Sequence, residues 1–369
     1  MADLTAPRKQ ISIWWFAFGY FAAYVPYSFM TKVLTDGLLV SPFPEMTKDS
    51  VSVNSFEILP PTIFASVVMM LIFISAMRWW KYATQWTLRL GGKEISLPRP
   101  RIWTLLSGIC TGLVVMTTTL AYTIEGVSIV FAMLLMRGGL LIMSPIVDTL
   151  NKRHVRWFSW CALALSLASL FVAFLAKPAA DGARFAFNMM LMVDVVVYLA
   201  AYFVRLSFMS KLAKSDNPDD TKKFFVEEQM IGTPSILIIL FLVSLFYSGQ
   251  DASTFIGGIY AGFHNFLQYP GIVVGLAMAI GFCSQFNGVF GGLVLLDKSE
   301  NAFSVPVNRC SSILAGVMAT LALAFFFDKP LSASEFVGAA FILCAILFLT
   351  IPPQISKRRA KRLAQRSEG

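Results

Sequence analysis

Two arginines lie deep inside long apolar segments, where a positive charge is costly. Arg137 falls near the middle of the run 127–149, and Arg309 lies well inside the run 301–327. An arginine facing lipid at this depth would cost about 2.5–3.5 kcal/mol on insertion scales. We therefore expect both to face a polar cavity, where a guanidinium binds carboxylate or phosphate through two parallel hydrogen bonds. The structural alternative is that each bonds helix carbonyls or a buried acid and only holds helices together.

Other polar and aromatic residues of the apolar segments are spaced to share helix faces. Tyrosines repeat at about one helical turn in the first and sixth segments. Such faces could line a cavity suited to a sugar or a base, or they could pack helix against helix. A lysine near a segment end could touch a solute or extend to the interface. Besides the two arginines, the candidate substrate-binding residues are Arg205, Lys32, Tyr20, Tyr24, Tyr198, Tyr202, Gln285, Asn287 and Asn308.

Acidic residues are scarce inside the apolar segments. Asp194 is the one acid clearly within a segment, and it could carry a coupling proton or neutralise an arginine. Pairing is the favoured interpretation, with Arg205 on the same helical face. Glu57 and Glu228 are predicted at the starts of helices, where the helix dipole favours negative charge, although both could guard entrances. Four cations against about one acid make a positive cavity, which attracts anions.

The composition determines which elements must position these groups. Apolar residues make up 57% of the 369 residues, charged residues 14%, and the mean hydropathy is +0.69. A soluble domain carries about 25% charged residues, so a water-soluble enzyme is excluded. A membrane span needs about 20 apolar residues. The sequence predicts an all-α membrane protein with ten transmembrane helices, at 12–34, 58–80, 102–124, 127–149, 157–176, 188–212, 228–248, 271–295, 301–327 and 333–352. The aromatic, glycine-rich segment 249–270 could lie along the interface.

The charges outside the spans orient the chain. Of the 30 Lys and Arg residues, 22 fall on the side of the two termini, four on the opposite side and four within spans. The positive-inside rule then places both termini in the cytoplasm. The basic tail 353–369 is interpreted as a lipid-facing cluster rather than a nucleic-acid site.

The two halves of the chain resemble each other at three places. Ser-Phe-Met-Thr-Lys at 28–32 resembles Ser-Phe-Met-Ser-Lys at 207–211. Glu57 with Thr62 matches Glu228 with Thr233, and the Glu-Phe-Arg set at 125, 131 and 137 matches an Asp-Phe-Arg set at 297, 303 and 309. Five spans per half invert the second half, which predicts a 5+5 inverted repeat, with 1–176 as the first unit and 177–352 as the second.

This layout resembles the drug/metabolite transporter superfamily. The resemblance depends on the inverted five-helix halves, the tight hairpin between the third and fourth spans, and the arginines in the fourth and ninth. The stretch Asn301–Arg309, followed by Phe-Asp-Lys-Pro at 327–330 and by Glu335, is similar to the nucleotide-sugar and triose-phosphate transporter branch. A nucleotide-sugar motif of the Gly-Ala-Leu-Asn-Lys type is absent from the sequence. The resemblance implies a ten-helix, EamA-like carrier.

The sequence lacks the motifs for ATP hydrolysis, metal binding and a disulfide framework. No Walker A sequence is present, His154 and His264 fall in loops, and the five cysteines show no disulfide or metal spacing. We expect no cofactor, no metal and no enzymatic activity. The leading hypothesis is a secondary transporter of a small organic anion, perhaps phosphorylated or nucleotide-linked. The alternatives are an exporter of amino acids or other neutral or zwitterionic metabolites, and a membrane enzyme or scaffold without a solute path. The expected partners are the solute and membrane lipids, in a monomer or homodimer of the bacterial inner membrane.

Overall fold

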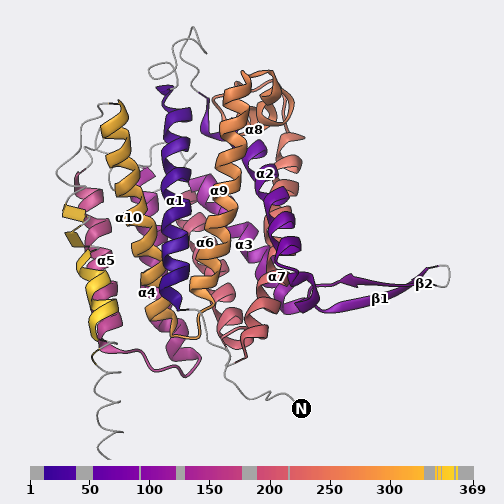
Figure 1. The fold of residues 1–369 in the computed structure, drawn as a ribbon. Helices are drawn as coiled ribbons and strands as arrows, with labels where there is room; N and C mark the ends of the chain where they lie inside the picture. The colour runs from indigo at the N-terminus through magenta and orange to yellow at the C-terminus, as the bar shows by residue number, and fades with distance from the viewer. Residues whose placement is uncertain are drawn as a thin grey trace, which may run out of the picture.

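The computed structural model is a bundle of long helices with a two-stranded hairpin projecting from one side (Figure 1). It describes residues 12–38, 53–90, 93–121, 129–176, 189–214, 217–327, 337–338, 340–341, 343–352 and 355. The basic tail, apart from residue 355, and the predicted turn at 125–126 lie outside these residues.

Ten α-helices are described in full. They are α1 (Ile13–Thr35), α2 (Ser55–Ala76), α3 (Ile102–Ala121), α4 (Ile129–Leu150), α5 (Trp157–Ala176), α6 (Met189–Leu212), α7 (Pro218–Ser244), α8 (Phe255–His264), α9 (Gly271–Leu295) and α10 (Asn301–Phe327). Two short 3-10 helices are η2 (Trp79–Tyr82) and η4 (Phe266–Gln268). Nine of the long helices occupy predicted spans, and the tenth predicted span is helical over 343–352.

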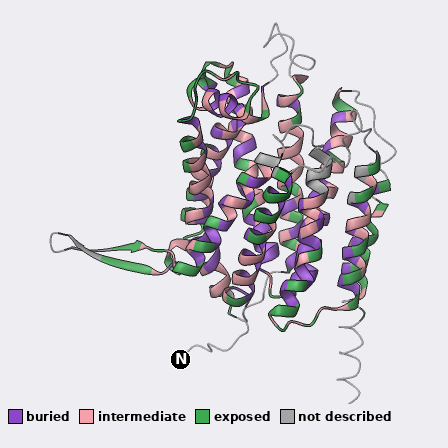
Figure 2. Cartoon of the chain, turned by 180° about the vertical axis from the view of Figure 1, so that it is seen from behind, coloured by how far each residue is buried: buried purple, intermediate pink, exposed green. Residues whose placement is uncertain are grey.

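The helices have the composition of membrane spans. Five of them, α2, α6, α7, α9 and α10, are long and apolar enough to cross a membrane. Large apolar side chains such as Phe64, Ile142 and Ile238 are exposed on the outside of the bundle, where Figure 2 also shows exposed residues. Water would disfavour so much exposed apolar surface, whereas lipid accepts it. The chain is a multi-pass helical membrane protein.

Glu57 and Glu228 were both predicted to lie at the starts of helices, and the structure confirms only the first. Glu57 lies in the first turn of α2, as predicted, behind an N-cap in which Asn54 accepts a hydrogen bond from the backbone N–H of Phe56. The start predicted for the seventh span is wrong, because α7 begins at Pro218 rather than at Glu228. Asn217 caps α7 there, with Pro218 at a position that favours helix initiation. The polar first turns of α7 conceal this start from a hydropathy analysis.

Two helices, α1 and α6, lie at the centre of the bundle, and each packs against two others. α1 packs against α9 and α10, and α6 packs against α3 and α4. Outside them, α2 contacts α9, α8 and α7, whereas α7 contacts α3. The close approach of α2 and α9 requires Gly281, because a Cβ there would lie 2.3 Å from the Thr62 carbonyl oxygen. Ser66 also donates a hydrogen bond to the Gly281 carbonyl at 2.8 Å.

The hairpin was not predicted from the sequence. Strands β1 (Gln85–Leu90) and β2 (Lys93–Pro98) pair antiparallel between α2 and α3. The segment 249–270, which was predicted to lie along an interface, forms α8 and η4 at the opposite end of the bundle (Figure 1). In this segment Tyr260 stacks on His264 and on Tyr247.

Candidate functional site

Arg137 and Arg309 lie on two helices that pack together, α4 and α10. Each is about two turns from the start of its helix, and each is half-buried. Within the described residues, neither guanidinium has a carboxylate partner. Arg309 donates from Nη2 to the Tyr202 hydroxyl at 3.2 Å and lies 5.9 Å from the centre of that ring. Its Nε is buried and has no hydrogen-bond partner in the part of the chain that the structure describes.

Two further tyrosines lie near the arginines. Tyr20 on α1 and Tyr198 on α6 each lie within electrostatic range of both Arg137 and Arg309. Tyr20 is 8% exposed and Tyr198 is 4% exposed, so both rings are inside the bundle. Tyr202 packs edge-on against Tyr198, with 4.9 Å between ring centres. We call Arg137, Arg309, Tyr20, Tyr198 and Tyr202 the arginine site.

The arginine site combines two positive groups with three hydroxyls in a buried region. An anion there would receive charge-assisted hydrogen bonds from guanidinium N–H groups and further bonds from tyrosine hydroxyls. Burial strengthens such bonds because little water screens them. An arginine Nε–H without a partner inside a protein is uncommon and marks a donor available to a ligand. The arrangement can therefore hold a carboxylate or a phosphate.

The three candidate amide side chains, Asn308, Gln285 and Asn287, differ in their hydrogen bonds. Asn308 donates to the Gly291 carbonyl at 3.2 Å, and Gln285 donates to Gln229 Oε1 at 3.3 Å. Asn287 lies one turn before Gly291 on the same helix, and its buried Oδ1 has no partner in the described parts of the chain. Asn287 therefore offers a buried acceptor to a ligand. Gln229 was missed by the sequence analysis, because a single amide near two acids gives no distinctive pattern.

Tyr24 extends the aromatic stripe of α1 away from the arginines. Its ring packs edge-on against Tyr20, with 5.6 Å between centres, and against Tyr27. Lys32 lies near the far end of α1, where its side chain is 60% exposed and its Nζ is 3.7 Å from an Asp36 oxygen. The structure therefore keeps Lys32 away from the arginine site, contrary to its prediction as a substrate ligand, and favours the interpretation that it extends to the interface.

Arg205 has a different environment from the other two arginines. Its Nε donates to Glu228 Oε1 at 2.8 Å, and its Nη2 donates to Oε2 at 3.1 Å. Ser107 and Thr111 also donate to Glu228 Oε1. The guanidinium of Arg205 is thus engaged by a carboxylate from α7. We correct its predicted role: in this conformation Arg205 joins α6 to α7 and α3 rather than binding a solute.

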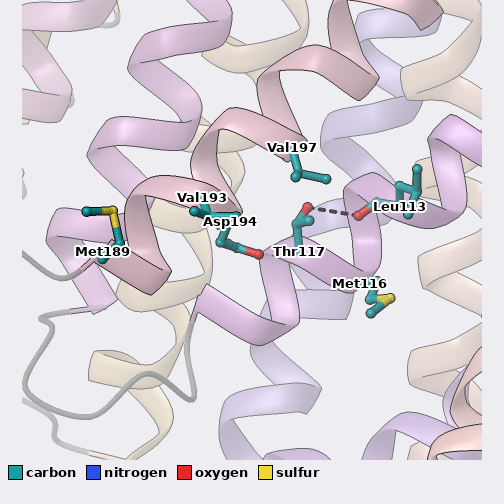
Figure 3. Close-up of a pocket in the computed structure, with 7 residues that line it drawn as sticks. All are labelled: Leu113, Met116, Thr117, Met189, Val193, Asp194 and Val197. Atoms are coloured by element: carbon teal, nitrogen blue, oxygen red, sulfur yellow. Dashed lines mark hydrogen bonds between the residues drawn. The ribbon is translucent and has the colours of Figure 1, made fainter.

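Asp194 does not neutralise Arg205, which pairs with Glu228. No other arginine of the described residues bonds it either, so the favoured pairing with Arg205 or another arginine is not found. Its side chain is 4% exposed, and both carboxylate oxygens lack a hydrogen-bond partner among the described residues. It lines a pocket of about 550 Å³ between α3 and α6. Figure 3 shows its carboxylate directed toward α3, near Thr117, whose hydroxyl bonds the Leu113 carbonyl instead. The remaining lining is apolar: Leu113, Met116, Met189, Val193 and Val197.

A second pocket lies between α2, α3 and α7 and is lined by apolar residues, among them Leu59, Ile63, Gly112 and Ile239. Neither of these two pockets is lined by Arg137 or Arg309.

Charged groups gather where α10 begins. Asp148, near the end of α4, accepts hydrogen bonds from the backbone N–H groups of Asn301 and Ala302. It therefore caps α10 from another helix, which stabilises its positive end. Arg156 donates twice to Glu300, at 2.6 and 2.8 Å. We call this set, with Lys214, the end cluster.

Lys214 completes the end cluster. It is 8% exposed, and its Nζ donates to the Ser299 carbonyl at 2.9 Å and to the Ser304 hydroxyl at 3.1 Å. Burial and the nearby Arg153 guanidinium together lower its pKa to about 7, against the opposing effect of the acids. Arg156, Lys214 and Glu300 fall between predicted spans and Asp148 at the end of one, and the sequence analysis did not bring them together.

No protein-family model and no curated protein sequence matches the chain. A solved structure described only as "Crystal structure of protein" aligns over 91% of this chain and 96% of its own, with a TM-score of 0.50 and 14% sequence identity. At this identity the similarity concerns the fold alone.

Proposed function

We propose that this chain is a secondary transporter that moves a small organic anion across a membrane by alternating access. Arg137 and Arg309 are the anion-binding groups in this proposal. The observation that carries it is that two half-buried arginines on packed helices have no carboxylate partner among the described residues, whereas Arg205 has one. A positive charge in a membrane is retained where it has a function.

The inverted repeat belongs to this proposal, and the packing of the helices supports it. If the halves are equivalent, α1 corresponds to α6, α2 to α7, α3 to α9 and α4 to α10. Under that correspondence the contacts of α1 with α9 and α10 match those of α6 with α3 and α4, and the contact of α2 with α9 matches that of α7 with α3. The remaining central contacts, α2 with α7 and α4 with α10, join equivalent helices. Such pseudo-two-fold packing gives two exchangeable conformations.

The end cluster indicates which end of the transporter is closed in this conformation. It ties the end of α4 and the start of α5 to the start of α10. We infer that ten helices span the membrane and that α8 lies at its interface. The end of the bundle that carries the end cluster then faces the cytoplasm of a bacterium. The cytoplasmic end is then closed in this conformation, and the opposite state requires the end cluster to separate.

Asp194 is the proposed site of the coupling proton. Every other buried acid of the described residues receives hydrogen bonds: Glu57 from Tyr269, Asp148 from Asn301, Glu227 from Thr104, Glu228 from Ser107 and Glu300 from Arg156. A carboxylate without such donors in an apolar pocket is stable only when protonated or paired with a cation. Uptake and release of a proton there would couple transport to a pH gradient.

Uptake into proteoliposomes tests the proposed function. Purified protein is screened with labelled phosphate esters, nucleotide-linked sugars, dicarboxylates and amino acids, with and without unlabelled solute inside. The proposal expects accumulation or exchange of an anion that is lost in Arg137→Gln and Arg309→Gln, with normal folding of both. Uptake of amino acids alone would favour the exporter alternative. No uptake of any class, with both variants as stable as the parent, would favour a membrane enzyme or scaffold.

A further inference from the structure

The β1–β2 hairpin leaves the bundle and runs across the helix axes, near the end where α1 begins (Figure 1). The two strands have no further strand partner in the described part of the chain. An isolated two-stranded hairpin is marginally stable in water, because it has no second layer to cover its apolar face. Something outside the bundle must therefore cover this face.

A single carboxylate holds both ends of the hairpin. Glu227 on α7 accepts hydrogen bonds at Oε1 from the backbone N–H and the hydroxyl of Thr84, just before β1. Its Oε2 accepts from the backbone N–H and Nε of Arg101, just after β2, and from Thr104. Glu227 itself is fully buried. This clamp fixes the direction in which the hairpin leaves the bundle.

The strand register makes the hairpin amphipathic. Residues directly opposite each other lie on the same face of an antiparallel pair, and successive residues alternate between faces. Trp86 lies opposite Leu97, and Thr87 lies opposite Ser96. The pair of Leu88 with Ile95 belongs to the same alternating set as Trp86 with Leu97. The pair of Arg89 with Glu94 belongs to the same set as Thr87 with Ser96. The set that contains Trp86 is therefore apolar except for Lys93, which pairs with Leu90 next to the turn. The set that contains Thr87 is polar except for Pro98, at the end of β2.

The apolar positions continue onto the bundle. Trp86 is 50% exposed and Leu97 is 43% exposed. Close to the root of the hairpin, Met77 at the end of α2 and both Ile102 and Trp103 at the start of α3 are also exposed apolar side chains. Exposed tryptophan beside aliphatic residues is typical of the membrane interface.

The charge around the hairpin is strongly positive. Residues 77–101 contain six basic residues and one acid, Glu94. Such a balance attracts anionic lipid headgroups to a surface. We infer that the hairpin is a membrane-interface anchor, with the Trp86–Leu97 face in the headgroup region of an anionic leaflet and the Thr87–Ser96 face toward water. The inference depends on the helices crossing a membrane and not on what the protein transports.

Lipid-facing labels on the two faces test the anchor. In a variant whose five cysteines are replaced, Leu97→Cys and Ser96→Cys each carry an environment-sensitive fluorophore. The protein is reconstituted in phosphatidylcholine vesicles with or without phosphatidylglycerol. We expect the label at 97 to shift to the blue and to be quenched by doxyl lipid, more so with phosphatidylglycerol. The label at 96, one residue away on the other face, should be quenched by iodide.

Two results would overturn the anchor. Equal iodide quenching at both positions would mean that the hairpin is free in water or awaits a soluble partner. A blue-shifted label at 97 that is unaffected by doxyl lipid and depends on protein concentration would indicate a second copy of the chain.

Hydrogen exchange on the unmodified protein gives an independent measurement if the cysteine-free variant does not fold. Slower exchange of strand amides in phosphatidylglycerol nanodiscs than in neutral detergent supports the anchor, and Trp86→Glu should remove the difference while Thr87→Glu should keep most of it. The same exchange in both media contradicts the anchor.

Discussion

Glu228 is expected to stabilise the fold through Arg205. The pair is buried, with the Glu228 side chain 1% exposed and that of Arg205 9% exposed. Removing one partner of such a pair leaves an uncompensated buried charge, at a cost of about 3–5 kcal/mol. We expect Glu228→Gln to lower the thermal stability of the purified protein, measured in detergent by the unfolding midpoint. The double variant Arg205→Met with Glu228→Leu should recover most of the loss, because it buries no charge. A stable Glu228→Gln protein would contradict this role.

Asp194→Asn tests coupling separately from binding. The amide keeps the shape of the side chain but carries no proton, so accumulation driven by a pH gradient should be lost. Exchange of labelled for unlabelled solute at equal pH should persist. Thr117→Val, in the same pocket, is the matched control and should retain both activities. If Asp194→Asn still accumulates solute against its gradient, the proton binds elsewhere.

The three arginines show which residue roles a sequence predicts. Their depth in apolar segments marks Arg137, Arg205 and Arg309 equally, and all three are inside the bundle. Their partners differ because the partner comes from another helix. Glu228 lies 10 residues after the start of α7, a start that the hydropathy pattern misplaces. Depth therefore marks all three arginines, but the packing of the helices decides which of them receives a carboxylate partner.

At the scale of elements, the contact between α2 and α9 depends on a missing side chain. At Gly281 a Cβ would lie 2.3 Å from the Thr62 carbonyl and 2.5 Å from Ala65, so the helices would have to separate. We expect Gly281→Ala to destabilise the protein by about 1–3 kcal/mol. Gly275, on the same helix, has nothing within 4 Å, so Gly275→Ala should be neutral or stabilising by about 0.5–1 kcal/mol. Equal unfolding midpoints for both variants would refute the close approach.

Most helices were predicted well because lipid imposes one simple rule on them. A span must be long, apolar and internally hydrogen-bonded, and hydropathy detects all of this. The hairpin was missed because its alternating pattern is only six residues per strand and lies in a loop counted for its charge. The start of α7 was missed because its first turns are polar and are stabilised by capping rather than by burial.

At the scale of the whole molecule, the end cluster should make stability depend on pH. Lys214 faces Arg153 from the α4–α5 connection, Asp148 from α4, and Asp297 and Glu300 from the α9–α10 connection. Its pKa falls from 10.5 to about 7 on folding. Between these values the unfolded chain holds a proton that the folded chain has released, so stability rises with pH across this window. The rise should reach a few kcal/mol, at about 1.4 kcal/mol per pKa unit.

Lys214→Met should remove that rise, because methionine has no titratable group. Unfolding midpoints measured from neutral to alkaline pH compare the two proteins. Parallel curves for Lys214→Met and the parent would assign the pH dependence to other groups.

The proposed function depends on an anion binding at Arg137 and Arg309. Isothermal titration of the purified protein with the best solute of the uptake screen measures this directly. Each of Arg137→Gln and Arg309→Gln should weaken binding at least about tenfold, since a charged hydrogen bond contributes about 1.5–3 kcal/mol. Both variants should unfold at the same temperature as the parent without solute. If both fold normally and bind the anion as tightly as the parent, the two arginines are not its site.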